Sequence, residues 1–161
     1  MIRNLRWLRY ALYLAALLFY SGTSIAAEGP SLLQSPAPEG AQVYFIEPRD
    51  GARLPLTFTV KFGLRGMGVS PAGIEKANTG HHHVLIDLQE LPDMNLPLPA
   101  TANIKHFGGG QTETMITLPP GEYTLQLLLA NHLHIPHKPA LISKPIKVTV
   151  VGDQDHDEHH H

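Results

Sequence analysis

The chain has 161 residues, with 12 lysines and arginines, 14 aspartates and glutamates, 11 histidines and no cysteine. Its formal net charge of −2 at pH 7 argues against nucleic acid and against an anionic membrane surface as partners. The lack of cysteine excludes disulfides, cysteine-based zinc sites and a blue-copper thiolate site, so packing of a core must stabilise the fold.

Residues 1–27 are typical of a cleaved signal peptide. Arginines at positions 3, 6 and 9 precede an apolar run over 11–20, and small residues lead to a cleavage site near Ala26 or Ala27. The run is shorter than the about 20 residues of a membrane span, so an uncleaved anchor is the weaker alternative. We expect a periplasmic or secreted protein with no membrane span after cleavage. It would carry 9 basic and 14 acidic residues, a net charge of −5.

The rest of the chain divides into three parts by composition. Residues 28–41 are rich in Pro, Ser and Gly and predict a flexible N-terminal lead-in. A single β-sandwich domain is expected over 42–151. Residues 152–161 are mostly Asp, Glu and His, which predicts a disordered tail and a weak chelating segment.

Alternating or continuous apolar residues between Pro- and Gly-rich turns predict short strands. The clearest case is 56–63, where Phe58, Val60 and Phe62 alternate with polar residues. The predicted strands are 42–45, 56–63, 82–88, 112–118, 123–129 and 144–150. No helical period appears after residue 27. The fold class predicted is all-β, an immunoglobulin-like (cupredoxin- or fibronectin-type) antiparallel β-sandwich of about seven strands.

Tyr123 supports this fold, because it follows the turn at Pro119–Gly121 and begins a strand. This is the position of the tyrosine corner that begins strand F of immunoglobulin-like sandwiches. The alternative is an ordinary strand aromatic. If 123–129 is strand F, three segments lie at one pole of the sandwich. They are the segment before 82–88, the segment before 112–118 and the loop after 129.

The histidines of the domain occur in three groups that this topology brings to that pole. They are His81–His83, His106, and His132, His134 and His137. Since side chains alternate along a strand, His81 and His83 face one side and His82 the other. We expect His132 and His134 to share one side of an extended loop.

Imidazole is the commonest metal-binding side chain and suits zinc and copper. We predict a copper or zinc ion as the cofactor. The candidate ligands are His81, His83, His106, His132 and His134, with Glu113 and His137 in reserve. A structural network of hydrogen-bonded imidazoles is the alternative, and no motif of high specificity is present.

The segments that carry these histidines resemble a known family. The runs VYFIEPRDGARLPLTFTVKFGLRGMGVSPAG, NTGHHHVLIDL and HFGGGQTETMITLPPGEYTLQLLLANHLHIPHKP look like the bacterial secreted domain of unknown function 4399 family. The resemblance covers about 42–150 and implies export and a single all-β domain. It supplies no catalytic residue or ligand.

The sequence therefore predicts an exported periplasmic metal-binding protein that traffics or buffers copper or zinc. It predicts no catalytic residue and no enzyme. A non-catalytic envelope module that binds a protein or glycan is the first alternative. A metal-dependent enzyme with Glu113 as general base is the second. Metal affinity is expected to fall steeply below about pH 6, where imidazoles protonate.

Overall fold

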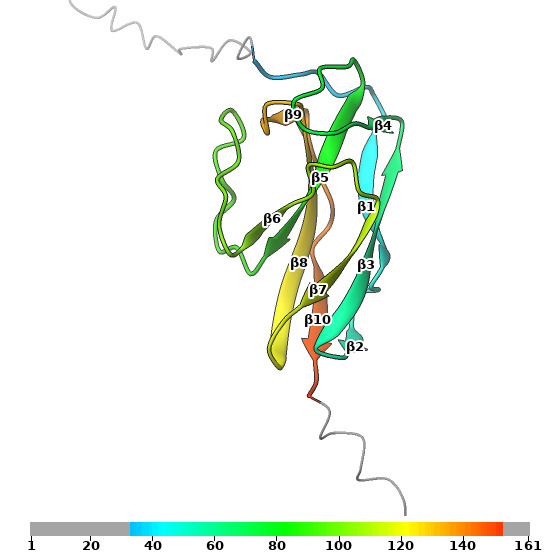
Figure 1. The fold of residues 1–161 in the computed structure, drawn as a ribbon, viewed down its shortest axis with the longest axis vertical. Helices are drawn as coiled ribbons and strands as arrows, with labels where there is room; N and C mark the ends of the chain where they lie inside the picture. Colours follow the sequence, from blue (N-terminus) through cyan, green and yellow to red (C-terminus); the bar gives the residue numbers. More distant parts are fainter. Residues whose placement is uncertain (1–32, 153–161) are drawn as a thin grey trace, which may run out of the picture.

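The computed structural model describes residues 33–152 (Figure 1). The predicted signal peptide and residues 153–161 of the predicted tail lie outside the described residues. No helix occurs between residues 33 and 152. That part of the chain therefore contains no helix long and apolar enough to cross a membrane.

Within residues 33–152, ten strands form two sheets that pack as a sandwich, as the all-β prediction requires (Figure 1). The smaller sheet has the order β1-β3-β7. The larger has the order β2-β10-β8-β5-β4, with β6 paired to β5 and β9 paired to β8. The strands are β1 Gln42–Glu47, β2 Ala52–Leu54, β3 Thr57–Arg65, β4 Gly68–Val69, β5 Thr79–Ile86, β6 Ile104–His106, β7 Glu113–Thr117, β8 Gly121–Ala130, β9 Pro136–Ile142 and β10 Ile146–Val150.

The main core lies between the sheets and comes from the alternation of apolar residues along the strands. In β3 the side chains of Phe58, Val60 and Phe62 are buried, while Thr57 and Thr59 are exposed. In β8 every second residue from Leu125 to Leu129 joins the same cluster. Burial of each such side chain stabilises the fold by about 1.5–3 kcal/mol.

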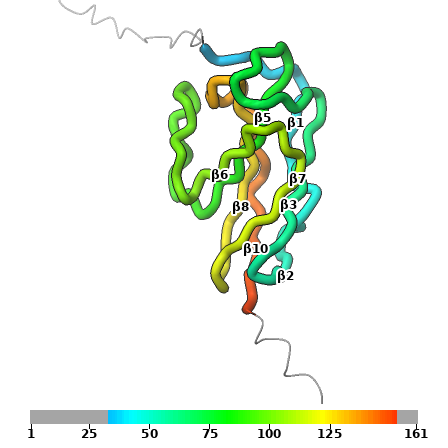
Figure 2. Tube along the Cα trace, in the orientation of Figure 1, coloured from blue at the N-terminus to red at the C-terminus, as the bar shows by residue number. Residues whose placement is uncertain are grey.

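A second, smaller core lies on the outer face of the larger sheet. Leu85, Leu128 and Ala130 point to that face and are covered by Leu98 and Ile104. Leu98 belongs to residues 87–103, here called the 87–103 loop, which leaves the end of β5 and returns in β6 (Figure 2). Strand β5 is thus buried on both faces, and its outer cover is a loop.

Tyr123 makes the contact expected of a tyrosine corner. Its hydroxyl donates a hydrogen bond of 2.9 Å to the carbonyl oxygen of Pro119, four residues earlier. The predicted strand F, now β8, lies between β5 and β10. This order agrees with strands C, F and G of an immunoglobulin-like sandwich, while the parallel pairing of β2 with β10 is an addition. The finer immunoglobulin-like assignment stays a prediction.

The structure describes residues 33–41 of the predicted flexible lead-in, and they are tied to the larger sheet. The backbone N–H of Ala37 donates to the carbonyl of Lys138, and the N–H of Lys138 donates to the carbonyl of Ser35. The side-chain amide of Gln34 donates to the carbonyls of Met94 and Pro136. The lead-in therefore connects β9 to the 87–103 loop.

Four strands were absent from the sequence prediction: β2, β4, β6 and β9. Three of them contain only two or three residues, too few to show a period. β9 was placed in a loop because it contains Pro136 and Pro139. Proline is tolerated there because β9 lies beside β8 at the edge of the sheet, where a missing N–H costs little.

Candidate metal centre

Strand β5 presents His81 and His83 on the outer face of the larger sheet and His82 on the inner face. His81 pairs in register with Ala130 and His83 with Leu128, two residues of the outer core. The His82 ring instead packs on Phe62 of the main core, with ring centroids 4.9 Å apart. The prediction that His82 faces away from the other two is confirmed.

Strand β6 places His106 beside the pair. His106 lies opposite His83 in the antiparallel register, and their ring centroids are 5.1 Å apart. Gly108 follows closely, and a Cβ atom at this glycine would collide with the His106 imidazole. The glycines after His106 therefore leave room for its ring.

A turn after β8 brings His134 beside the rings of His81, His83 and His106. Buried Asn131 builds the turn, because its side-chain oxygen accepts hydrogen bonds of 3.0 Å from the N–H groups of Leu133 and Ile135. His134 has a φ of 66°, a left-handed conformation uncommon for a non-glycine residue. Its carbonyl accepts a 2.9 Å hydrogen bond from Leu98 N–H, which ties the turn to the 87–103 loop. The sequence analysis missed Asn131, although an Asx turn at a strand end is a known signal.

These four residues, His81, His83, His106 and His134, form what we call the imidazole cluster. The Nε2 atoms of His106 and His134 are 3.0 Å apart. One ring nitrogen from each of His81, His83 and His106 lies within 4.8 Å of the others. The His81 ring centroid is 4.8–4.9 Å from each of the other three. Four nitrogens around one zinc ion would be about 3.3 Å apart, given Zn–N bonds near 2.0–2.1 Å.

The cluster is buried where it meets the sheet. His81 and His83 are at most 1% exposed, and both ring nitrogens of His81 and the Nδ1 of His83 have no hydrogen-bond partner. Leaving a buried polar group without a partner costs about 1–3 kcal/mol. A metal ion bound by these nitrogens would offset that cost.

Burial also keeps these rings neutral, the state that binds metals. Burial and then the neighbouring rings of His134 and His106 lower the pKa of His81 to about 4. Burial, followed by the ring of His81, lowers the pKa of His83 to about 3. Burial and His134 lower the pKa of His106. The neutral rings of His81 and His83 therefore each have a nitrogen lone pair that can bind a metal at neutral pH.

Residues 60–151 match a protein family described as Domain of unknown function (DUF4399). The chain belongs to the DUF4399 family. The match includes all four histidines of the imidazole cluster, and it confirms the resemblance seen in the sequence motifs.

Other comparisons with this DUF4399 domain add little about function. None of the curated proteins compared with the chain matches it. The X-ray structure of the endo-beta-1,4-mannanase from Thermotoga petrophila resembles it with a TM-score of 0.42 and 19% sequence identity. That likeness covers 70% of this chain and 20% of the mannanase chain, so the DUF4399 protein spans about a fifth of its length.

The other predicted ligands of the DUF4399 domain lie outside the imidazole cluster. His137 is buried in β9, where its nitrogens lie 3.4 Å from the carbonyl oxygen of Leu129 and 3.1 Å from that of Thr79. Burial lowers its pKa. His132 lines a different cavity, with Ser70 and Asn131. The expectation that His132 and His134 share one side of an extended loop is wrong, because residues 131–134 form a turn closed by the His134 N–H.

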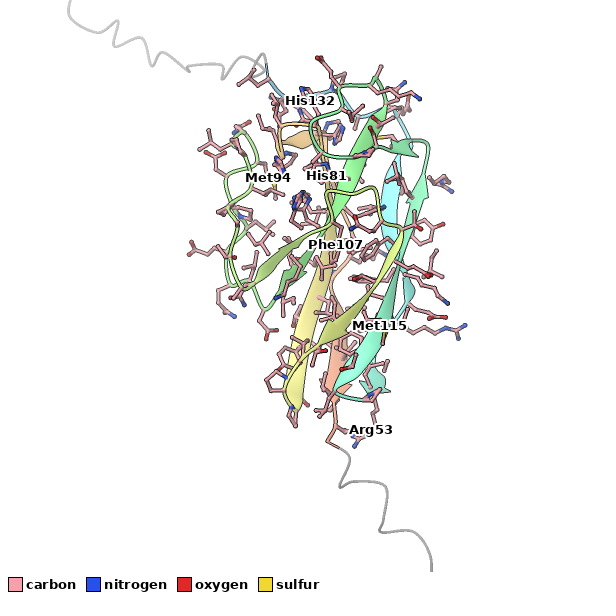
Figure 3. The ribbon with its side chains drawn as sticks, viewed as in Figure 1. Arg53, His81, Met94, Phe107, Met115 and His132 are labelled. Atoms are coloured by element: carbon pink, nitrogen blue, oxygen red, sulfur yellow. The ribbon has the colours of Figure 1, made fainter. Side chains whose placement is uncertain are left out.

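Glu113 is also separate from the cluster. It begins β7 in the smaller sheet, opposite Lys61 of β3, and its side chain is exposed. The sequence analysis placed the start of this strand at the same pole as the histidines, but a shared pole does not bring Glu113 to the cluster, because β7 lies in the smaller sheet. In Figure 3, His81 lies between the main body of the sandwich and the 87–103 loop that carries Met94. The candidate site is thus on the outer face of the larger sheet.

Proposed function

We propose that this DUF4399 protein is an exported metal-binding protein that traffics or buffers copper or zinc. The proposed ligands are His81, His83, His106 and His134. The observation that supports this most strongly is the convergence of ring nitrogens from three separate segments, with His81, His83 and His106 within 4.8 Å and His134 at 3.0 Å from His106. Imidazole ligands suit both zinc and copper.

The proposal includes export because residues 1–27 have the composition of a signal peptide. In an oxidising compartment, a site made of imidazoles contains no thiol that could be oxidised. The chain has no cysteine at all. A metal carrier outside the cytoplasm is therefore chemically consistent with the ligand set.

We favour binding and transfer over catalysis. The enzyme alternative relied on Glu113 as a general base, and this residue is exposed on the other sheet. A general base must come within about 3 Å of the proton it removes, directly or through one water. Among residues 33–152, the candidate metal-binding group contains histidines and no carboxylate.

The test is a titration of the full mature chain in which His156, His159, His160 and His161 are replaced by alanine. This variant removes the imidazoles of the tail and leaves the domain intact. We expect one Cu(II) or Zn(II) per chain with a dissociation constant below about 1 μM. The double variant His106→Ala/His134→Ala should lose this binding, and His132→Ala should keep it. Absence of submicromolar binding in the tail variant would overturn the proposal.

A further inference from the structure

A cavity of about 230 Å³ adjoins the imidazole cluster. His83, His106 and His134 form one side of it, and His81 is not among its lining residues. Apolar side chains of residues 97–100 and Ile104 form the rest. The cavity thus opens onto three of the four rings whose nitrogens would hold a metal, and it offers space beside that metal.

The walls of the cavity are uncharged. None of the residues that line the cavity has a carboxylate or an ammonium group. The rings that contact His81 on this face are those of His83, His106 and His134, and none of them is a carboxylate. A divalent ion bound here would keep its full charge of +2 in a partly dehydrated site. Buried charges without a partner of opposite sign are strongly unfavourable.

We infer that the bound metal takes a small exogenous anion as an additional ligand, and that this anion lies in the apolar cavity. This inference depends on the proposed metal binding at the cluster. The anion class is a monodentate donor with a compact body, such as a short carboxylate, a halide or azide. It partly neutralises the metal through a direct bond, while the walls at 97–100 enclose the rest of the anion.

The 87–103 loop gives this pocket a fixed wall. Leu98 is buried, and its N–H is bonded to the carbonyl of His134, so the wall and one ligand are held together. Pro97 and Pro99 flank Leu98 and restrict the backbone. Ala100 is exposed at the edge of the cavity, where a larger side chain would fill space without disturbing the core.

Thermodynamic linkage makes this binding measurable. An anion that binds the metal-loaded protein more tightly than the metal-free protein must raise the metal affinity by the ratio of those two anion affinities. The probe is azide added to the Cu(II)-loaded full chain carrying the tail substitutions. A new azide-to-copper charge-transfer absorption should saturate at one azide per copper. Ala100→Phe should weaken azide binding by about tenfold or more and leave Cu(II) binding without azide unchanged.

Ala102→Phe is the matched control, because Ala102 is exposed in the same loop and does not line the cavity. It should bind azide as the parent does. If copper binds but azide produces no saturable band, or if Ala100→Phe binds azide like Ala102→Phe, the inference is overturned and the proposed function stands. If the parent binds neither Cu(II) nor Zn(II), both are overturned.

Discussion

The Nε2 atoms of His106 and His134 lie 3.0 Å apart although 28 residues separate them in the chain. At this distance the two nitrogens share one proton as a hydrogen bond or direct their lone pairs at one metal ion. Both rings are more accessible than His81 and His83, which are buried. His106 and His134 are therefore the ligands that can be replaced with least damage to the fold.

We predict that His134→Ala weakens Cu(II) or Zn(II) binding by more than about a hundredfold. Changes to the partners of metal ligands already cost about 10–100-fold in affinity, and loss of a ligand costs more. Isothermal titration calorimetry of the chain with the tail substitutions measures the effect. His132→Ala changes a histidine two residues away that lines another cavity, and it should keep the parent affinity. Equal losses in the two variants would contradict the assignment.

Gly108 offers a test of the geometry that leaves every ligand in place. A methyl group at this position would collide with the His106 ring, so Gly108→Ala should displace that ring. We expect about a tenfold loss of metal affinity, with the free energy of unfolding changed by less than about 0.5 kcal/mol. Gly109→Ala is the control, since its added methyl meets only the side chain of Gln111. Unchanged affinity in Gly108→Ala would show that His106 is not a ligand.

Parts of this site follow from local sequence patterns. The separation of His82 from His81 and His83 is a consequence of alternation along one strand, and it needs no tertiary information. The same alternation predicted the core residues Phe58, Val60 and Phe62. Local rules work here because each element is long enough to show its period.

Other parts depend on contacts that no local pattern encodes. His106 joins the cluster through β6, a strand of three residues. His134 joins it through the Asn131 turn and a left-handed backbone. Glu113 was misplaced because two strands can end at the same pole and still belong to different sheets. The position of the site on an outer face depends on the 87–103 loop, which the sequence shows only as an irregular segment.

His82 provides a prediction about stability in the metal-free protein. Its two ring nitrogens are buried in the main core without partners, and burial lowers its pKa to about 4. Replacing the ring by an apolar side chain of similar size removes an unpartnered polar group. His82→Leu should therefore raise the free energy of unfolding at pH 7 by about 1–2 kcal/mol. Urea denaturation with a chelator present measures this change, and a loss of stability would contradict it.

The same residue should make the parent sensitive to acid. The pKa of His82 is about 4 in the folded state and about 6.5 in the unfolded chain, so the unfolded chain binds more protons between these values. The contribution of neutral His82 to the free energy of unfolding is complete above pH 6.5, and it is lost as the pH falls towards 4. Between pH 7 and pH 5, His82 should account for roughly 2 kcal/mol of this loss. His82→Leu should lose correspondingly less stability than the parent over that interval.

Metal binding should tolerate acid better than the sequence alone indicates. Four imidazoles with the usual pKa near 6.5 would lose about ten-thousandfold in affinity between pH 7.5 and 5.5, because protons compete at every ligand. In the structure, burial lowers the pKa of His81 to about 4 and that of His83 to about 3. These two rings remain neutral at pH 5.5, so protons compete with the metal only at the more accessible ligands.

We therefore expect the affinity for Cu(II) to fall by no more than about a hundredfold between pH 7.5 and 5.5. Competition with a chelator of known proton affinity measures it, in the chain with the tail substitutions. The unmodified tail supplies the comparison, because its histidines lie at the end of the chain and any metal held there should be released near pH 6. A loss of four orders of magnitude in the domain would mean that His81 and His83 do not bind the metal as buried neutral rings.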